Sequence, residues 1–141
     1  MVSITFQPTT EDTILFVGGG EVAERRIQLF IDEPCNIVVI APTVTDRICQ
    51  WAKDNRIIWY DRAFTMDDEH HIITSSLFFI CTDNGELNDT LYDMGKKHRV
   101  WTNRSDDPRA CRFTVPSSLE LGDLHIAISA NNVCLLYTSD A

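Results

Sequence analysis

The chain contains the segment Ile14-Leu15-Phe16-Val17-Gly18-Gly19-Gly20-Glu21-Val22-Ala23-Glu24-Arg25-Arg26, in which four apolar residues run directly into three glycines. The apolar run predicts a strand, and the residues after the glycines have helical spacing. Gly18, Gly20 and Ala23 fill the small positions of G-x-G-x-x-G/A, which is typical of a turn that binds the pyrophosphate of a dinucleotide. A glycine-rich turn without a ligand is the alternative interpretation.

Size and charge set the general class of the protein. A chain of 141 residues with 44% hydrophobic and 23% charged residues is expected to form one globular domain. The formal net charge of −9 disfavours nucleic acid and anionic membranes as partners. An acidic small molecule would need a local cluster of Arg or Lys.

The five cysteines indicate a reducing compartment. They form no C-x-x-C pair and their number is odd, so we expect free thiols and no disulfide or zinc framework. The N-terminus has no signal-peptide pattern, and no apolar stretch reaches the ~18 residues of a membrane span. A cytoplasmic protein is therefore predicted, and no residues have the spacing of a metal site.

Short β-rich runs alternate with helical patterns along residues 1–108. The predicted strands are Ile14–Val17, Ile37–Ile40, Ile57–Tyr60, Leu77–Cys81 and Val100–Thr102. The predicted helices are Glu21–Ile31, Thr45–Asp54 and Asn84–Lys97. This alternation predicts an α/β fold, a Rossmann-like doubly wound parallel sheet of order 3-2-1-4-5.

The pattern changes after Pro108. Phe113–Pro116 and Leu124–Ser129 read as two strands joined by the loop Ser117–Asp123, so residues 109–132 are predicted to begin a small β appendage. Residues 134–141 match the conceptual translation of a transposase sequencing adaptor in reverse complement. Residues 133–141 are therefore predicted to be a non-native tail; an ordinary C-terminal strand is the alternative.

Ligands of such sheets bind at the carboxyl ends of the strands. The second strand ends in Ala41-Pro42-Thr43, without the carboxylate that usually binds the ribose, so the residues give NAD only a modest preference over NADP. Asp83 either caps the following helix or touches the cofactor.

Charged residues gather after the fifth strand. Asp106 and Asp107 offer either a general base or a turn cap. Arg104, Arg109 and Arg112 could receive an acidic substrate, or they could be solvated loop residues. His70-His71 is interpreted as solvated surface.

These segments together resemble the N-terminal domain of siroheme synthase and its stand-alone relatives, the precorrin-2 dehydrogenases. The matching pieces include Val17–Arg26, Val39–Pro42, Cys81–Asn84 with Leu87-Asn88, Asn103–Pro108, Cys111–Phe113 with Pro116, and Gly122–Ser129. The resemblance covers residues 1–132. The series N-x-x-D-D-P…C-x-F…P…G-D-L-x-I-A-I-S is far more specific than the glycine motif.

The resemblance implies NAD-dependent oxidation of precorrin-2, a tetrapyrrole, to sirohydrochlorin; some relatives also insert Fe²⁺. The family's essential aspartate falls on Asp106, which would accept a proton. Its cofactor contacts fall on Gly18, Gly19, Gly20, Glu21, Val22, Pro42, Thr43, Thr82 and Asp83. Arg104, Arg109 and Arg112 would then meet the substrate carboxylates.

The resemblance also has departures. The family's C-terminal helical part, which serves homodimerisation and closes the substrate site, does not appear, and Ala130 stands where some relatives carry a regulatory serine. A nucleotide-sensing regulatory domain without catalysis is the rival hypothesis. Such a domain would need the glycine turn but neither Asp106 nor the β appendage.

Overall fold

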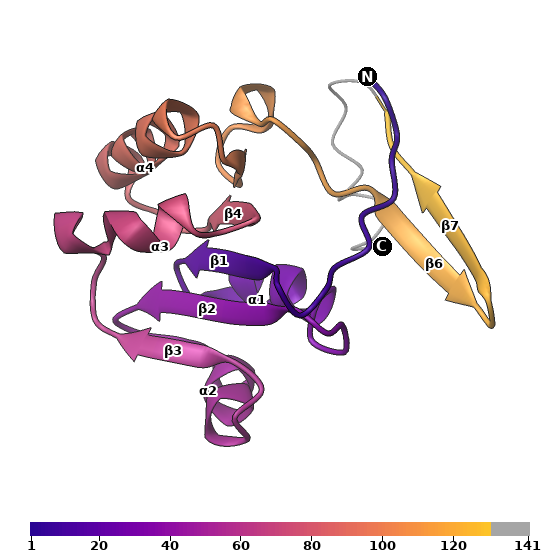
Figure 1. The fold of residues 1–141 in the computed structure, drawn as a ribbon, viewed down its shortest axis with the longest axis horizontal. Helices are drawn as coiled ribbons and strands as arrows, with labels where there is room; N and C mark the ends of the chain where they lie inside the picture. The colour runs from indigo at the N-terminus through magenta and orange to yellow at the C-terminus, as the bar shows by residue number, and fades with distance from the viewer. Residues whose placement is uncertain (131–141) are drawn as a thin grey trace.

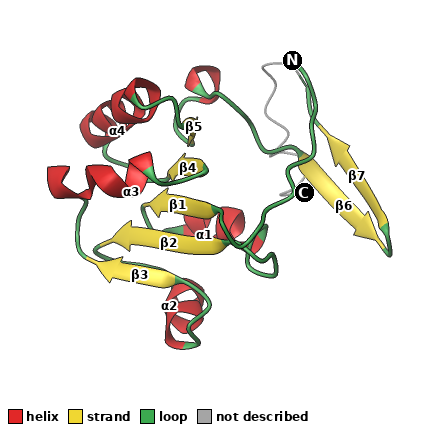
Figure 2. Ribbon diagram, viewed as in Figure 1, coloured by secondary structure: helices red, strands yellow, loops and turns green. Residues whose placement is uncertain are grey.

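A five-stranded parallel sheet with helices on both faces forms the body of the molecule (Figures 1 and 2). The computed structural model describes residues 1–130. The strands are β1 (Thr13–Val17), β2 (Asn36–Ala41), β3 (Ile58–Asp61), β4 (Leu77–Ile80) and β5 (Trp101–Arg104). They lie in the order β3-β2-β1-β4-β5, which confirms the predicted topology.

The helices of residues 1–130 are α1 (Glu21–Gln28), α2 (Asp46–Lys53), α3 (Glu69–Ile73) and α4 (Gly85–Lys97), and side chains cap the N-termini of α2 and α4. Thr45 caps α2 by accepting a hydrogen bond from the Ile48 amide, and Asn84 caps α4 by accepting one from the Leu87 amide. Gly20 precedes α1 without any side-chain cap, so the first amides of α1 have no partner from a capping side chain.

The sheet separates two apolar layers. Alternate residues of β1 face opposite sides: Ile14 and Phe16 pack with α1 and α2, whereas Leu15 and Val17 pack with α3 and α4. Phe16 stacks on Phe79 of β4 with ring centroids 4.9 Å apart. Both faces of the central strands are covered, which explains why these strands are apolar without alternation.

The sequence predicts solvated surface for His70-His71; His70 is exposed, whereas His71 is not. Residues 66–73 around them form a 3-10 turn, η1 (Met66–Asp68), and the short helix α3, whose Ile72 is fully buried. The guanidinium of Arg62 binds both oxygens of buried Asp68, at 2.5 and 2.6 Å, and holds the pKa of that carboxyl down at about 2. His71 is largely buried rather than solvated, and burial lowers its pKa.

The predicted β appendage is present, but its first strand is displaced. Residues 113–116 return along β5, and the antiparallel pair consists of β6 (Ser117–Leu121) and β7 (Leu124–Ile128). Because Pro116 has no amide to donate, the ladder begins after it, where Leu119 and Leu121 alternate with polar residues. This hairpin projects from the body (Figure 1).

The sequence also predicts no membrane span and a non-native tail. No helix among residues 1–130 is long and apolar enough to cross a membrane. The predicted tail, residues 133–141, lies outside the described residues, and the division of the chain near residue 108 stays a prediction.

Candidate functional site

The glycine turn between β1 and α1 is tightly held by its neighbours. Gly18 has φ +113°, and a Cβ there would lie 2.6 Å from the carbonyl carbon of Cys81. A Cβ on Gly19 would lie 2.5 Å from the Thr43 carbonyl oxygen. Gly18 therefore turns the chain and brings it against β4, as the sequence predicts, and Gly19 fits it against the β2–α2 loop.

Gly20 is the open side of this turn. A Cβ built on Gly20 meets no atom within 4 Å, and the residue is exposed at the start of α1. The uncapped N-terminus of α1 therefore faces open space, with the exposed Glu21 and the half-buried Val22 as its first residues. Amides without side-chain partners, at the positive end of a helix, fit the pyrophosphate of a dinucleotide.

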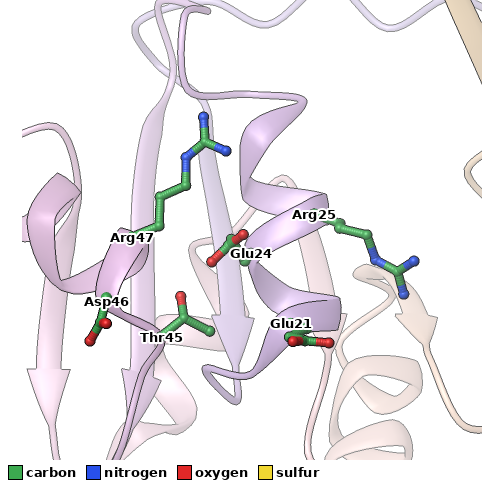
Figure 3. Close-up of a pocket in the computed structure, with 6 residues that line it drawn as sticks. All are labelled: Glu21, Glu24, Arg25, Thr45, Asp46 and Arg47. Carbon is green, nitrogen blue, oxygen red and sulfur yellow. The ribbon is translucent and has the colours of Figure 1, made fainter.

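A hollow of about 680 Å³ lies beside the turn, between α1 and α2 (Figure 3). It is lined by Glu21, Glu24, Arg25, Thr45, Asp46 and Arg47. Glu24 and Arg47 lie between the two helices, whereas Arg25 is on the far side of α1 (Figure 3). The carboxylates here come from the helices and not from the end of β2, where Pro42 and Thr43 are exposed.

The side-chain amide of Asn88 links the loop after β4 to Asp106, which follows β5. Asn88 of α4 is fully buried, and its Nδ2 donates to the Thr82 carbonyl at 2.9 Å and to Asp106 Oδ2 at 3.0 Å. The Thr82 hydroxyl donates to Asn88 Oδ1. Asn84 caps α4, so Asp83 is not the cap and stays exposed at this edge.

Asp106 lies where β5 ends, at the same edge of the sheet as the glycine turn. The register places Val17 beside Ile80, and Ile80 beside Arg104. Arg104 Nε donates to Asp106 Oδ1 at 2.6 Å, and its guanidinium also pairs with Asp89 at 2.8 Å. The hydrogen bond from Arg104, followed by the hydrogen bond from Asn88 and the charge of Arg104, holds the pKa of Asp106 below its usual value of 3.8. Asp106 is therefore a carboxylate at neutral pH and can accept a proton.

The three predicted substrate arginines do not form one cluster. Arg104 is occupied by Asp106 and Asp89, and these contacts raise its pKa further. Arg109 is exposed, with Nε 3.7 Å from Asp107 Oδ1. Arg112 lies at the other end of β5, with its guanidinium 5.9 Å from the centre of the Trp101 ring. The structure therefore separates Arg104 from the other two.

Asp107 has the role of a turn cap. Its Oδ1 accepts a hydrogen bond from the Arg109 amide at 3.2 Å, at the start of the turn η2 (Pro108–Ala110). Of the two neighbouring aspartates, Asp106 is the one that faces the loop after β4.

Two residues of this edge carry roles that sequence reasoning missed. Asn88 appears in the sequence only as part of a family motif, and a polar residue one helical turn before the apolar Leu91 is the signal that could have singled it out. Cys111 accepts a hydrogen bond from the Arg104 amide at 3.1 Å, and burial raises the pKa of its thiol. Among the described residues no three His, Cys, Asp or Glu side chains gather as a metal site would require.

The fold and the glycine turn define a dinucleotide-binding domain of the Rossmann type. Residues 6–117 match the family model described as putative NAD(P)-binding, and the chain belongs to this family. A nucleotide cofactor, predicted from the glycine turn, is thereby confirmed at the level of NAD(P).

The most similar sequences include siroheme synthases. The siroheme synthase of Pseudoalteromonas atlantica is 29% identical over 128 residues, which are 91% of this chain and 27% of that protein. Siroheme synthase 3 of Aeromonas hydrophila is 32% identical over 117 residues, 83% of this chain and 24% of that protein. The predicted resemblance to siroheme synthase is confirmed, and the chain spans about a quarter of the length of these curated relatives.

A solved structure has the same fold. SirC, precorrin-2 dehydrogenase, superposes with a TM-score of 0.77 at 22% sequence identity, over 99% of this chain and 67% of that one. This likeness confirms the Rossmann-like sheet with its appended β strands.

Proposed function

We propose that this chain carries the NAD-binding and proton-accepting parts of a precorrin-2 dehydrogenase, which oxidises precorrin-2 to sirohydrochlorin on the route to siroheme. The names of the relatives support the substrate. The observation that carries the proposal is the ionised Asp106, held by Arg104 and Asn88 at the edge of the sheet where the glycine turn opens.

The oxidation removes a hydride and a proton from the substrate. Bound NAD⁺ supplies the acceptor for the hydride. The amides that follow Gly20 would hold its pyrophosphate, with Pro42-Thr43 and Thr82-Asp83 bordering the cofactor. Asp106 accepts the proton on a carboxylate oxygen, while Arg104 and Asn88 keep that carboxylate in place.

NAD is proposed over NADP because of the charges in the hollow between α1 and α2. Glu21, Glu24 and Asp46 line it together with two arginines, so carboxylates outnumber cations there. A 2′-phosphate on the ribose would be repelled by this excess of negative charge.

The rival function is an NAD-sensing regulatory domain. Such a domain needs the glycine turn but has no use for a fixed carboxylate beside it. The contacts of Asp106 with Arg104 and Asn88, from two other positions of the fold, favour the enzyme.

The test replaces Asp106 by Asn in the full-length protein. Asp106→Asn should bind NAD as the wild type does but oxidise precorrin-2 about 10²–10⁴-fold more slowly, because the proton acceptor is lost. Asp107→Asn is the matched control, since Asn also caps a turn, and it should keep its turnover. Undiminished oxidation by Asp106→Asn would refute the enzyme hypothesis.

We further propose a homodimer formed through the β6–β7 hairpin. Leu119 pairs with Ile126 and Leu121 with Leu124, so these side chains share one face of the hairpin with Ile128. All five are at least 39% exposed. A two-stranded hairpin with an uncovered apolar face is marginal in water, and a second copy would cover it.

A cytoplasmic location is proposed on the cysteines. The four in the described part of the chain, Cys35, Cys49, Cys81 and Cys111, are free thiols.

A further inference from the structure

A second hollow, of about 540 Å³, lies at the outer edge of β5, between the end of α4 and the turn η2. It contains Trp101 and Thr102, at the beginning of the strand, whereas Arg104 and Asp106 lie at its other end. Figure 1 shows α4 and the short orange helix that follows β5, the two helices that contribute lining residues. The hollow is therefore separate from the glycine turn and from Asp106.

Four cationic side chains line this hollow and come from different segments of the chain. Lys96 lies in the last turn of α4 and Arg99 just after it, whereas Arg109 lies in η2 and Arg112 in the segment that follows η2. No Asp or Glu of residues 1–130 lines it, although the chain carries a net charge of −9. Four like charges around one hollow repel each other, and an anion bound between them would relieve that repulsion.

The cations of the hollow are poorly neutralised by the protein itself. Within the described part of the chain, neither Lys96 nor Arg99 forms an ion pair, whereas the adjacent Lys97 lies 3.7 Å from Glu69 on the other side of α4. Arg109 lies 3.7 Å from Asp107, but its side chain is 85% exposed, so this pair contributes little.

Aromatic surface accompanies the charges. Tyr92 and Trp101 both line the hollow, and Trp101 is 40% exposed. Arg112 lies over the Trp101 ring, which holds its guanidinium at the hollow. A bare inorganic ion would use the charges but not these rings.

We propose that this hollow binds an organic polycarboxylate, with the arginines and Lys96 on its carboxylates and the exposed part of the Trp101 ring against its carbon skeleton. Guanidinium groups match planar carboxylates with paired hydrogen bonds, and an aromatic face adds contact that phosphate cannot use. The site does not depend on the proposed oxidation, because it shares no residue with the Asp106 contacts.

Titration calorimetry with trimesate, a benzene ring that carries carboxylates, tests this proposal on the 141-residue chain. Trimesate should bind saturably and more tightly than inorganic phosphate, and added KCl should weaken it. The double variant Lys96→Gln/Arg109→Gln should bind trimesate at least about tenfold more weakly, because two charge-assisted contacts are lost.

The double variant Lys53→Gln/Lys97→Gln is the matched control. It removes the same charge from exposed positions outside the hollow and should bind trimesate as the wild type does. Three results would overturn the proposal: no saturable binding of trimesate, binding of phosphate as tight as that of trimesate, or equal weakening in the two double variants.

Discussion

Asp106 receives two different kinds of support. Arg104 contributes a charge and a short hydrogen bond, while Asn88 contributes a neutral donor fixed in the interior of the protein. The hydrogen bond and the charge of Arg104 lower the pKa of Asp106, which keeps the carboxylate ionised but makes it a weaker base. Such a base suits a substrate whose proton becomes acidic as the hydride leaves.

Arg104→Gln should reveal this effect in the pH dependence of oxidation. Without the guanidinium the pKa of Asp106 rises toward its usual 3.8, so the acid limb of kcat/KM should move to higher pH. The sign agrees with linkage: Asp106 stabilises the folded protein above its unfolded pKa, and this contribution is lost as pH falls through the lower folded pKa.

The control for this experiment is Asp89→Asn. It removes the other carboxylate on Arg104 but leaves the contact between Arg104 and Asp106. Its acid limb should stay near that of the wild type. A loss of activity in Arg104→Gln that is equal at every pH would show that Arg104 is merely structural.

The sequence predicts Asp106 but not the residues that hold it. Element order alone places both Asp106 and Asp107 after a strand that ends at the edge of the sheet where ligands bind, and the family resemblance selects Asp106 of the two. Asn88 is on a helix whose place beside that edge depends on the packing of α4 against β4 and β5. Arg112 is separated from Arg104 because the chain reverses direction after β5. No local sequence pattern predicts this reversal.

The three glycines between β1 and α1 have different roles. Gly18 and Gly19 are needed for contacts within the protein, whereas Gly20 is needed for none. A side chain at Gly20 should therefore be tolerated by the fold and excluded by a ligand.

Gly20→Glu should abolish NAD binding without unfolding the protein. Its backbone has φ −83°, which any residue adopts, and its side chain would project into open space with a negative charge where the pyrophosphate is expected. Calorimetry with NAD measures the loss, and thermal melting checks the fold.

Gln28→Glu, at the opposite end of α1, adds the same charge and should keep the affinity for NAD. Normal affinity in Gly20→Glu would contradict the assignment of the cofactor to this turn.

The strands β1, β2 and β4 are predictable because each consists mainly of an apolar run. The predicted fifth strand, Val100–Thr102, misses the polar second half of β5, Asn103 and Arg104. The fold of segment 66–73 is not predictable in this way, since Ile72 is its only buried apolar residue and its anchor is the pairing of buried Asp68 with Arg62, in the loop that leads into the segment. The strand β6 lies in the segment Ser117–Asp123, which is predicted as a loop because of its turn residues Gly122-Asp123. Its alternation of Leu with Ser and Glu, which is typical of a strand, is visible in the sequence.

At the scale of the whole molecule, the sheet body and the hairpin differ in how they bury apolar surface. The body covers both faces of its central strands with its own helices. The hairpin leaves the face of Leu119, Leu121, Leu124, Ile126 and Ile128 uncovered by residues 1–130.

Ile126→Glu should weaken self-association of the chain, because it places a charge in the middle of the apolar face. Sedimentation velocity over a range of concentrations should show dimers of the wild type and monomers of the variant, with unchanged melting of the sheet body. His125→Glu changes the opposite face and should still dimerise. Identical sedimentation of wild type and Ile126→Glu would contradict the proposed interface.

The segment that returns along β5 also closes the sheet. The Arg112 amide donates to the Thr102 carbonyl, Cys111 Sγ bonds both the amide and the carbonyl of Arg104, and the Asn103 side chain reaches the Phe113 carbonyl. A sulfur atom and a side-chain amide thus take places that a neighbouring strand would occupy. These contacts occupy backbone groups of β5 with which an extended peptide from another molecule could pair. Edge-to-edge polymerisation of the sheet is therefore blocked along β5.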